Sequence, residues 1–199
     1  LNLSQEYQYN VMEIREDNFG IALFSKIKLL NSRIEYFGDA GLPSAAAKFY
    51  TGDKEVSILA THPLPPVNRR NFELRNNQFD SIIRNRDNFK RSMILLGDLN
   101  ATSWSYGFQN LLKGTELYDS RRGYGIGFSW PSSLPVLSLP IDHCLVSKDI
   151  EVLKRETGPN LGSDHLPVYV ELRIAGASSD SVKNIGDNTD KIDNASEVL

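Results

Sequence analysis

Residues 94–104 read ILLGDLNATSW, an apolar run followed by a glycine and by two short polar side chains that flank a leucine. A short apolar run that ends at a glycine predicts a buried strand followed by a turn. Asp98 and Asn100 are favoured turn and helix-cap residues, so the stretch taken alone fits an ordinary turn as well as the edge of an active site.

The segments on both sides of this stretch predict several strands and two helices. Runs compatible with β-strands, divided by Gly, Pro, Asn and Asp, lie at residues 19–25, 33–38, 45–51, 55–62, 92–98, 141–147, 150–157 and 165–174. The prolines of HPLPPV (62–67) prevent a central strand there, because proline lacks the amide hydrogen that a sheet needs. Residues 68–89 have apolar side chains close to helical spacing, and residues 105–114 predict a short helix with Gly114 as its C-terminal cap.

Length and composition predict one globular domain. The chain has 199 residues, of which 40% are hydrophobic and 24% charged, and no apolar window is long enough to span a membrane. We expect a folded domain over residues 1–174 and an acidic, flexible tail over residues 175–199, which has five acidic residues and two lysines. The tail accounts for the whole formal charge of −3, so residues 1–174 are neutral and a broadly basic nucleic-acid-binding module is disfavoured.

Polar residues follow or begin four of the apolar runs. They are His62, Asp98 with Asn100, Asp142 with His143, and Asp164 with His165. Taken alone, Asp98 with Asn100 fits a turn as well as a site, Asp164 with His165 fits a turn better than a site, and His62 fits a solvent-facing loop as well as a site. Side chains at strand ends on one sheet edge can nevertheless converge from distant sequence positions, so together the clusters indicate a site.

The motifs TH, GDLN, IDH and SDH, in this order, resemble the endonuclease/exonuclease/phosphatase superfamily of metal-dependent phosphodiesterases. The resemblance covers residues 8–173, and THPLPP, RNNQF and IDHCLVS are most similar to a bacterial branch, several members of which have membrane helices upstream. It implies an α/β fold of two mixed β-sheets packed face to face with helices outside, a four-layer α/β/β/α sandwich.

The resemblance implies roles in the hydrolysis of a phosphate ester. Asp98 would activate the attacking water, and Asn100 would contact the scissile phosphate. We expect these two side chains to face the same side of the strand because they are two residues apart, with Leu99 directed toward the core. His165 would donate to a phosphate oxygen, and Asp142 would accept a hydrogen bond from its other ring nitrogen.

Further residues match the family less specifically. Asp164 resembles a metal ligand and His62 a second phosphate-contacting histidine, with Mg²⁺ or Mn²⁺ as the implied cofactor. Arg75 and Asn76 would bind substrate or brace the sheet. Trp130, like Trp104, is a substrate wall or a core residue.

One family feature has no counterpart here. The family's main metal-binding glutamate lies in a QE pair far upstream of an SK motif, whereas Gln5 and Glu6 lie close to Ser25. Glu6 is therefore not assigned as a ligand. We expect the first strands and first helix of the domain to be missing from this sequence, with a possible membrane anchor upstream of Leu1. The chain alone would then be poorly active, and its location, cytoplasmic or membrane-tethered and extracytoplasmic, stays open.

The leading hypothesis is a phosphoesterase that depends on a divalent metal and acts on nucleic acid, a phospholipid or an inositol phosphate. The alternative is a catalytically silent binding or scaffold domain of the same fold, suggested by the missing glutamate. No protein partner is implied. Loops rather than the shared catalytic edge select the substrate, so the sequence leaves its identity open.

Overall fold

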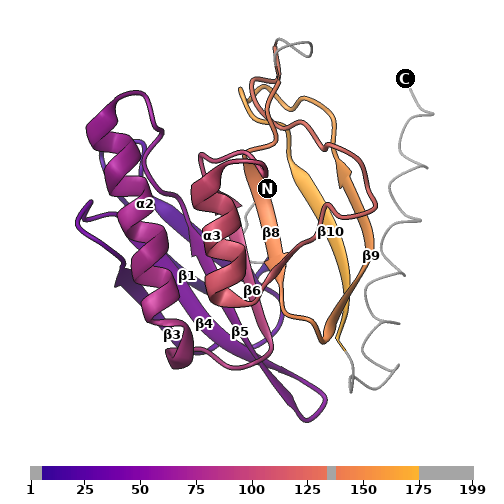
Figure 1. Ribbon diagram of the computed structural model, residues 1–199. Helices are drawn as coiled ribbons and strands as arrows, with labels where there is room; N and C mark the ends of the chain where they lie inside the picture. The colour runs from indigo at the N-terminus through magenta and orange to yellow at the C-terminus, as the bar shows by residue number, and fades with distance from the viewer. Residues whose placement is uncertain (1–5, 134–137, 175–199) are drawn as a thin grey trace, which may run out of the picture.

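A six-stranded mixed sheet forms the centre of the protein in the computed structural model, which describes residues 6–133 and 138–174 (Figure 1). Its strands follow the order β3 (Leu30–Tyr36), β4 (Pro43–Thr51), β5 (Lys54–Thr61), β6 (Met93–Asp98), β8 (Asp142–Val146) and β7 (Tyr118–Asp119). The neighbours β5 and β6 are parallel, and the other neighbours are antiparallel. A parallel pair needs a crossover connection, which here runs through the predicted amphipathic helix.

Two helices, α2 (Arg69–Arg84) and α3 (Tyr106–Thr115), lie side by side on one face of this sheet (Figure 1). A short 3₁₀ turn, η1 (Arg86–Asn88), follows α2. The side chain of Asn68 accepts a hydrogen bond from the amide of Asn71 and so caps α2. The apolar sides of α2 and α3 are buried against the sheet. The fully buried side chains of this core include Phe79 and Ile82 of α2, Phe108 of α3, Leu59 of β5 and Leu95 of β6.

The end of α3 differs from the sequence prediction. Gly114 is not the cap, because α3 continues to Thr115 and Glu116 takes the left-handed conformation at φ 56°. A Cβ on Gly114 would approach side-chain atoms of Ile83 to 2.6 Å. The glycine is therefore explained by close packing between the two helices rather than by termination of α3.

Two hairpins cover the opposite face of the sheet. One joins β1 (Tyr9–Glu13) to β2 (Ile21–Ser25), and the other joins β9 (Ile150–Thr157) to β10 (Val168–Ile174). Each packs on the six-stranded sheet through apolar side chains, such as Val11 on Ala45 and Ala60 in the first case. The alternating burial along β10 is typical of a strand with one face on a core.

This arrangement confirms the predicted α/β sandwich with mixed sheets. In residues 6–133 and 138–174 the helices flank only the six-stranded sheet, and the two hairpins form separate sheets. The tail predicted at 175–199 lies outside the described residues. Among the helices that are described, none has the length and apolar character needed to cross a bilayer.

Candidate active site

The carboxyl ends of β5 and β6 meet at one edge of the sheet because these strands are parallel. His62 follows β5 directly, and Asp98 ends β6. Just before Asp98, Gly97 has φ +141°, and a Cβ there would collide with the carbonyl oxygen of Thr61. A glycine at this position therefore allows the two strands to approach each other where the polar side chains begin.

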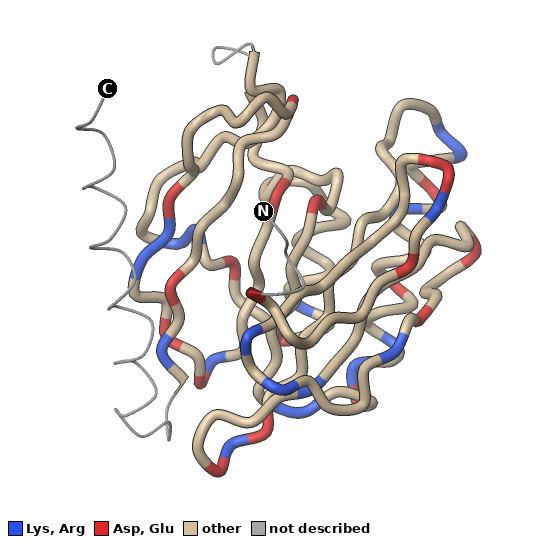
Figure 2. Tube along the Cα trace, turned by 180° about the vertical axis from the view of Figure 1, so that it is seen from behind, with Lys and Arg blue, Asp and Glu red and all other residues tan. Residues whose placement is uncertain are grey.

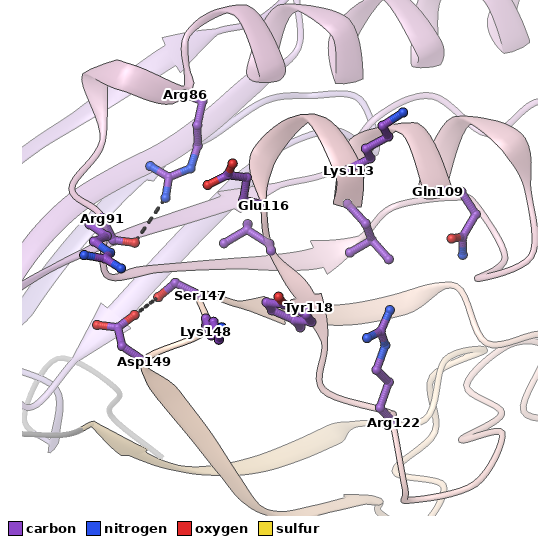
Figure 3. A pocket seen from close by; sticks show the side chains of 12 residues that line it. Arg86, Arg91, Gln109, Lys113, Glu116, Tyr118, Arg122, Ser147, Lys148 and Asp149 are labelled. Atoms are coloured by element: carbon purple, nitrogen blue, oxygen red, sulfur yellow. Dashed lines mark hydrogen bonds between the residues drawn. The ribbon is translucent and has the colours of Figure 1, made fainter.

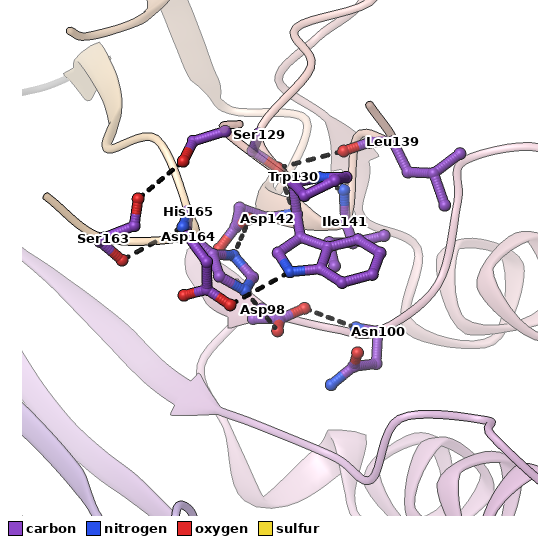
Figure 4. A network of polar contacts seen from close by, with 12 residues as sticks. Asp98, Asn100, Ser129, Trp130, Leu139, Ile141, Asp142, Ser163, Asp164 and His165 are labelled. Atoms are coloured by element: carbon purple, nitrogen blue, oxygen red, sulfur yellow. Dashed lines mark hydrogen bonds and ion pairs between the residues drawn. The ribbon is translucent and has the colours of Figure 1, made fainter. Parts of the chain in front are cut away.

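Asp98 lies between two imidazoles. Its Oδ2 is 3.5 Å from Nε2 of His62 and 3.8 Å from Nε2 of His165. Asp142 stands opposite Asp98 in the register of β6 and β8, and its Oδ2 lies 2.9 Å from Nδ1 of His165 (Figure 4). The structure thus brings together four of the residues singled out in the sequence, from four separate segments of the chain.

Asn100 reaches the site by a different route from the one predicted. The strand ends at Asp98, and Asn100 takes a left-handed conformation at φ 47°, so the prediction that strand alternation aligns the two residues is wrong. The backbone amide of Asn100 donates to Oδ1 of Asp98 at 2.8 Å, and its side-chain amide donates to the carbonyl of Pro63 at 3.0 Å. Asparagine tolerates this conformation better than most residues do. Leu99 is fully buried in the core, as predicted.

Arg75 and Asn76 lie at the base of the site. The Arg75 side chain is 3% exposed and donates to the carbonyl oxygen of Asn100 at 2.8 Å, so it holds the left-handed turn. Burial lowers the pKa of its guanidinium. Asn76 does not line the pocket, and its side-chain oxygen accepts hydrogen bonds from Arg75 at 2.9 and 3.2 Å. Its position therefore corresponds to the bracing alternative of the prediction.

Asp164 and Trp130 form the side of the site next to His165. The indole nitrogen of Trp130 donates to Oδ2 of Asp164 at 3.3 Å, and the indole lies 6.3 Å from the imidazole of His165 (Figure 4). Trp130 is thus a wall of the site, one of the two alternatives from the sequence. Trp104, in contrast, is 63% exposed and does not line this pocket.

A cavity of about 1110 Å³ opens over these groups. Several of its walls were not identified from the sequence: Asn18, Phe19, Pro65, Pro66, Val67, Phe72, Leu139 and Ile141. The ring centroid of Phe19 lies 5.2 Å from that of His62. The proline-rich segment after β5 was an available signal, since a segment that leaves a catalytic strand end is well placed to line a cavity.

His143 was given no catalytic role, and it lies beneath the site rather than in the cavity. It is 3% exposed, its Nε2 is 2.8 Å from the carbonyl oxygen of Ala101, and it packs 4.4 Å from the ring of Phe108. Burial lowers the pKa of this imidazole. His143 therefore supports the loop that follows Asn100.

The donor groups do not make a complete metal centre. In the part of the chain that the structure describes, no three His, Cys, Asp or Glu side chains are grouped so that they could hold a metal ion. Both oxygens of Asp98 already face an amide or an imidazole, and Glu6 pairs with Lys26 at 2.8 Å. Carboxylate-rich sets are what Mg²⁺ requires, so the residues described here do not fit the implied metal by themselves.

Charge along the chain is mixed rather than segregated. Figure 2 shows basic and acidic residues interspersed on the tube, in keeping with the neutral body inferred from the sequence. The charged side chains among the cavity residues are Arg75, Asp98 and Asp164, together with the two histidines. The site is therefore a pocket of mixed charge rather than part of a broad basic surface.

Solved structures of other proteins share the fold of this chain. Among solved structures, the chain is similar to the 3′ phosphatase NExo from Neisseria bound to a product DNA hairpin, with 18% identity, a TM-score of 0.68, and 83% of this chain and 79% of that one covered. An endonuclease/exonuclease/phosphatase from Bacteroides vulgatus has 18% identity and a TM-score of 0.68, with 86% and 77% covered. These likenesses show a shared fold.

A third structure is larger than this chain. The endonuclease/exonuclease/phosphatase from Beutenbergia cavernae DSM 12333 has 20% identity and a TM-score of 0.64, and the match covers 79% of this chain but 48% of that one. The chain therefore spans about half the length of that relative. A search of curated proteins gives no match. The sequence profile described as Endonuclease/Exonuclease/phosphatase family matches residues 3–165. Since this match includes most of the chain, the protein belongs to the Endonuclease/Exonuclease/phosphatase family, whose members are hydrolytic phosphoesterases.

Proposed function

We propose that the cavity over Asp98 hydrolyses phosphate esters, with Asp98 as the group that orients and deprotonates the attacking water. The observation that carries this proposal is the position of Asp98 Oδ2 within 3.8 Å of both His62 Nε2 and His165 Nε2. A carboxylate next to two potential cations is suited to hold water beside a phosphate, whose oxygens need hydrogen-bond donors as charge develops.

His165 would donate to a phosphate oxygen through Nε2. Asp142 accepts from Nδ1, so the neutral tautomer would leave Nε2 without a hydrogen and only the imidazolium has a proton there to donate. Asp142 fixes the ring plane and so the direction in which Nε2 points.

Asn100 would contact the phosphate with the second hydrogen of its side-chain amide. The first hydrogen is used on Pro63, and the backbone turn is held by Asp98 and by Arg75. This amide is therefore fixed before the substrate binds. Preorganised donors cost little reorganisation in the transition state, which is the main advantage of such a geometry. His62, 30% exposed at its side chain, would contact a second phosphate oxygen.

A divalent cation, Mg²⁺ or Mn²⁺, would supply a Lewis acid for the phosphoryl oxygens, and Asp164 is the carboxylate proposed to face it. Because the described donors are incomplete, no step is assigned to the metal. If the chain binds neither ion in a calorimetric titration and turns over no ester, the alternative of a silent binding domain of this fold is favoured.

The decisive variant is Asp98→Asn, which preserves shape and removes the base. We expect turnover of p-nitrophenyl phosphate or bis(p-nitrophenyl) phosphate to fall by about 10²- to 10⁴-fold while the melting temperature stays close to that of the unmodified protein. Asp87→Asn, on the exposed 3₁₀ turn, is the matched control and should leave turnover unchanged. Full activity in a pure Asp98→Asn protein would reject the assignment. The two substrates also distinguish a monoesterase from a diesterase.

A further inference from the structure

A second cavity, of about 780 Å³, lies at the opposite end of β6 and β8 from Asp98 (Figure 3). It is bounded by the C-terminal half of α3 and by residues next to Met93 and Ser147, where β6 begins and β8 has ended. Leu112 and Leu117 give it an apolar lining, and Tyr118 stands near its middle. Its size is that of cavities that hold small ligands or a short part of a chain.

Two charged groups of this cavity are already occupied by the protein. The guanidinium of Arg86 donates to the carbonyl oxygens of Thr115 at 2.9 Å and of Lys90 at 2.9 Å. Asp149 pairs with Lys54 at 2.5 Å and so is neutralised from outside the cavity. In these two residues the N–H donors of Arg86 and the charge of Asp149 are thus already used within the protein.

Four other cations of the same cavity have no such partner. In the described part of the chain, the side chains of Arg91, Lys113 and Lys148 make no ion pair or hydrogen bond, and Arg122 makes only a stacking contact, 5.3 Å above the ring of Tyr118. Figure 3 shows Arg122 directed toward α3, with Lys148 and Arg91 beyond Tyr118. Glu116 is the one remaining carboxylate among the lining residues. The cavity therefore has an excess of positive charge within a body, residues 1–174, that is neutral as a whole.

The cavity continues along α3 toward the catalytic pocket. A smaller hollow of about 340 Å³ shares Gln109, Leu112 and Arg122 with it and ends at Trp104. The neighbours of Trp104 in the same loop, Thr102 and Ser105, line the catalytic cavity. We call this path, from Trp104 along α3 to Lys148, the α3 groove.

The α3 groove has an exposed aromatic residue at each end of the helix. Trp104, before α3, is 63% exposed, and Tyr118, after it, is 41% exposed. The ten residues of α3 span about 15 Å. Cations that alternate with exposed aromatic side chains are the combination that binds single-stranded nucleic acid, because the cations follow the phosphates and the rings stack on bases.

We propose that the α3 groove binds single-stranded nucleic acid, with phosphates on Lys113, Arg122 and Lys148 and bases stacked on Trp104 and Tyr118. This assigns a binding site away from Asp98, and it does not depend on the proposed hydrolysis. A helical duplex is disfavoured because its bases are stacked inside and cannot reach the two rings. A polyanion without bases would contact only the cations and not the two aromatic rings.

The test measures binding of a short fluorescent oligothymidylate to the full chain by anisotropy, in chelator so that no hydrolysis occurs. We expect the double variant Lys113→Gln/Lys148→Gln to weaken binding roughly tenfold at low salt and to reduce the slope of log affinity against log salt by about 1.4, since each lost phosphate contact is worth about 0.7. The control, Lys28→Gln, changes an exposed lysine outside the cavity. Equal affinities for the double variant and the unmodified protein would overturn the proposal.

A second arm separates nucleic acid from other polyanions. Inorganic polyphosphate of matched charge should bind more weakly than the oligonucleotide, and Trp104→Ala should weaken oligonucleotide binding several-fold without changing polyphosphate binding. Equal binding of both probes, with no effect of Trp104→Ala, would show a bare anion site and reject the nucleic-acid assignment. Because the readout is binding in the absence of turnover, failure of the proposed hydrolysis would not affect it.

Discussion

Nδ1 of His165 lies 2.9 Å from Oδ2 of Asp142, although the two residues are 23 positions apart in the chain. Asp142 is at the start of β8, in the six-stranded sheet, whereas His165 is in the loop before β10. The contact therefore joins the six-stranded sheet to the second hairpin. It also fixes which nitrogen of His165 faces Asp98, because the other nitrogen is occupied.

Asp142→Asn tests this relationship. Asparagine is of the same size and can still accept from Nδ1, but it does not stabilise an imidazolium by charge. We expect kcat for a phosphate ester to fall by roughly 10²-fold or more, with a smaller change in KM, because the lost interaction matters most as charge develops on the phosphate. Steady-state kinetics check this, with circular dichroism to confirm the fold. Unchanged kcat in a folded Asp142→Asn protein would contradict the proposed role of His165.

Gly97→Ala tests the approach of β5 and β6 at the site. A Cβ at Gly97 would collide with the Thr61 carbonyl oxygen, and φ of +141° is strained for any residue with a side chain. We expect a loss of about 3 kcal/mol or more in the free energy of unfolding, measured by urea denaturation, together with loss of activity. The matched control is Gly123→Ala, at φ +89° with no atom within 4 Å of the new Cβ, which should cost about 1 kcal/mol. Similar losses of unfolding free energy in the two variants would show that a collision with the Thr61 carbonyl is not the cause.

Local sequence patterns predicted the elements that dominate this fold. The apolar run predicted β6 to within one residue of its ends. The amphipathic spacing predicted a helix over residues 68–89, which covers α2 and the 3₁₀ turn that follows it, but α2 itself ends at Arg84. The short strand β7 was not predicted. Its two residues carry no periodic pattern, and their strand conformation depends on pairing with β8. Such pairing is a tertiary effect that a local pattern does not contain.

The candidate site was predicted only in part, because local patterns show where strands end but not which tertiary contacts form there. Strand ends identified Asp98, Asp142 and His62 as residues that can converge, because parallel and antiparallel registers bring those ends to one edge. The left-handed turn at Asn100 depends on Arg75, from a helix 25 positions earlier, and could not be read from the GDLN motif. The family resemblance supplied the roles, and the tertiary structure supplied the geometry.

Asp149 should stabilise the far end of the sheet in a pH-dependent way. Burial alone would raise the pKa of Asp149, but the ion pair with Lys54 and hydrogen bonds from Ser92 and Ser147 outweigh burial and hold this pKa well below its usual value of 3.8. A carboxyl group whose pKa is lower in the folded protein than in the unfolded chain stabilises the fold at any pH above the unfolded pKa. This contribution is lost as the pH falls below the unfolded pKa.

We therefore expect Asp149→Asn to lower the free energy of unfolding by about 1–2 kcal/mol near neutral pH, in urea denaturation. The difference from the unmodified protein should shrink as the pH falls below 3.8, where the unfolded carboxyl is already protonated. Asp53→Asn, at an exposed turn, is the control and should have little effect at either pH. A difference that stays constant into the acid range would exclude the charge as its cause.

His143 should make the protein less stable in mild acid. Burial lowers the pKa of this imidazole below its usual 6.5, so the folded protein keeps it neutral while the unfolded chain takes up a proton. The corresponding stability is present above pH 6.5 and decreases as the pH falls below that value. His143→Gln removes the titration but keeps an amide hydrogen for the carbonyl of Ala101. We expect the free energy of unfolding, followed by urea denaturation, to fall less steeply in His143→Gln than in the unmodified protein over this range. An equal slope in His143→Gln and the unmodified protein would show that protonation of His143 does not account for the loss of stability.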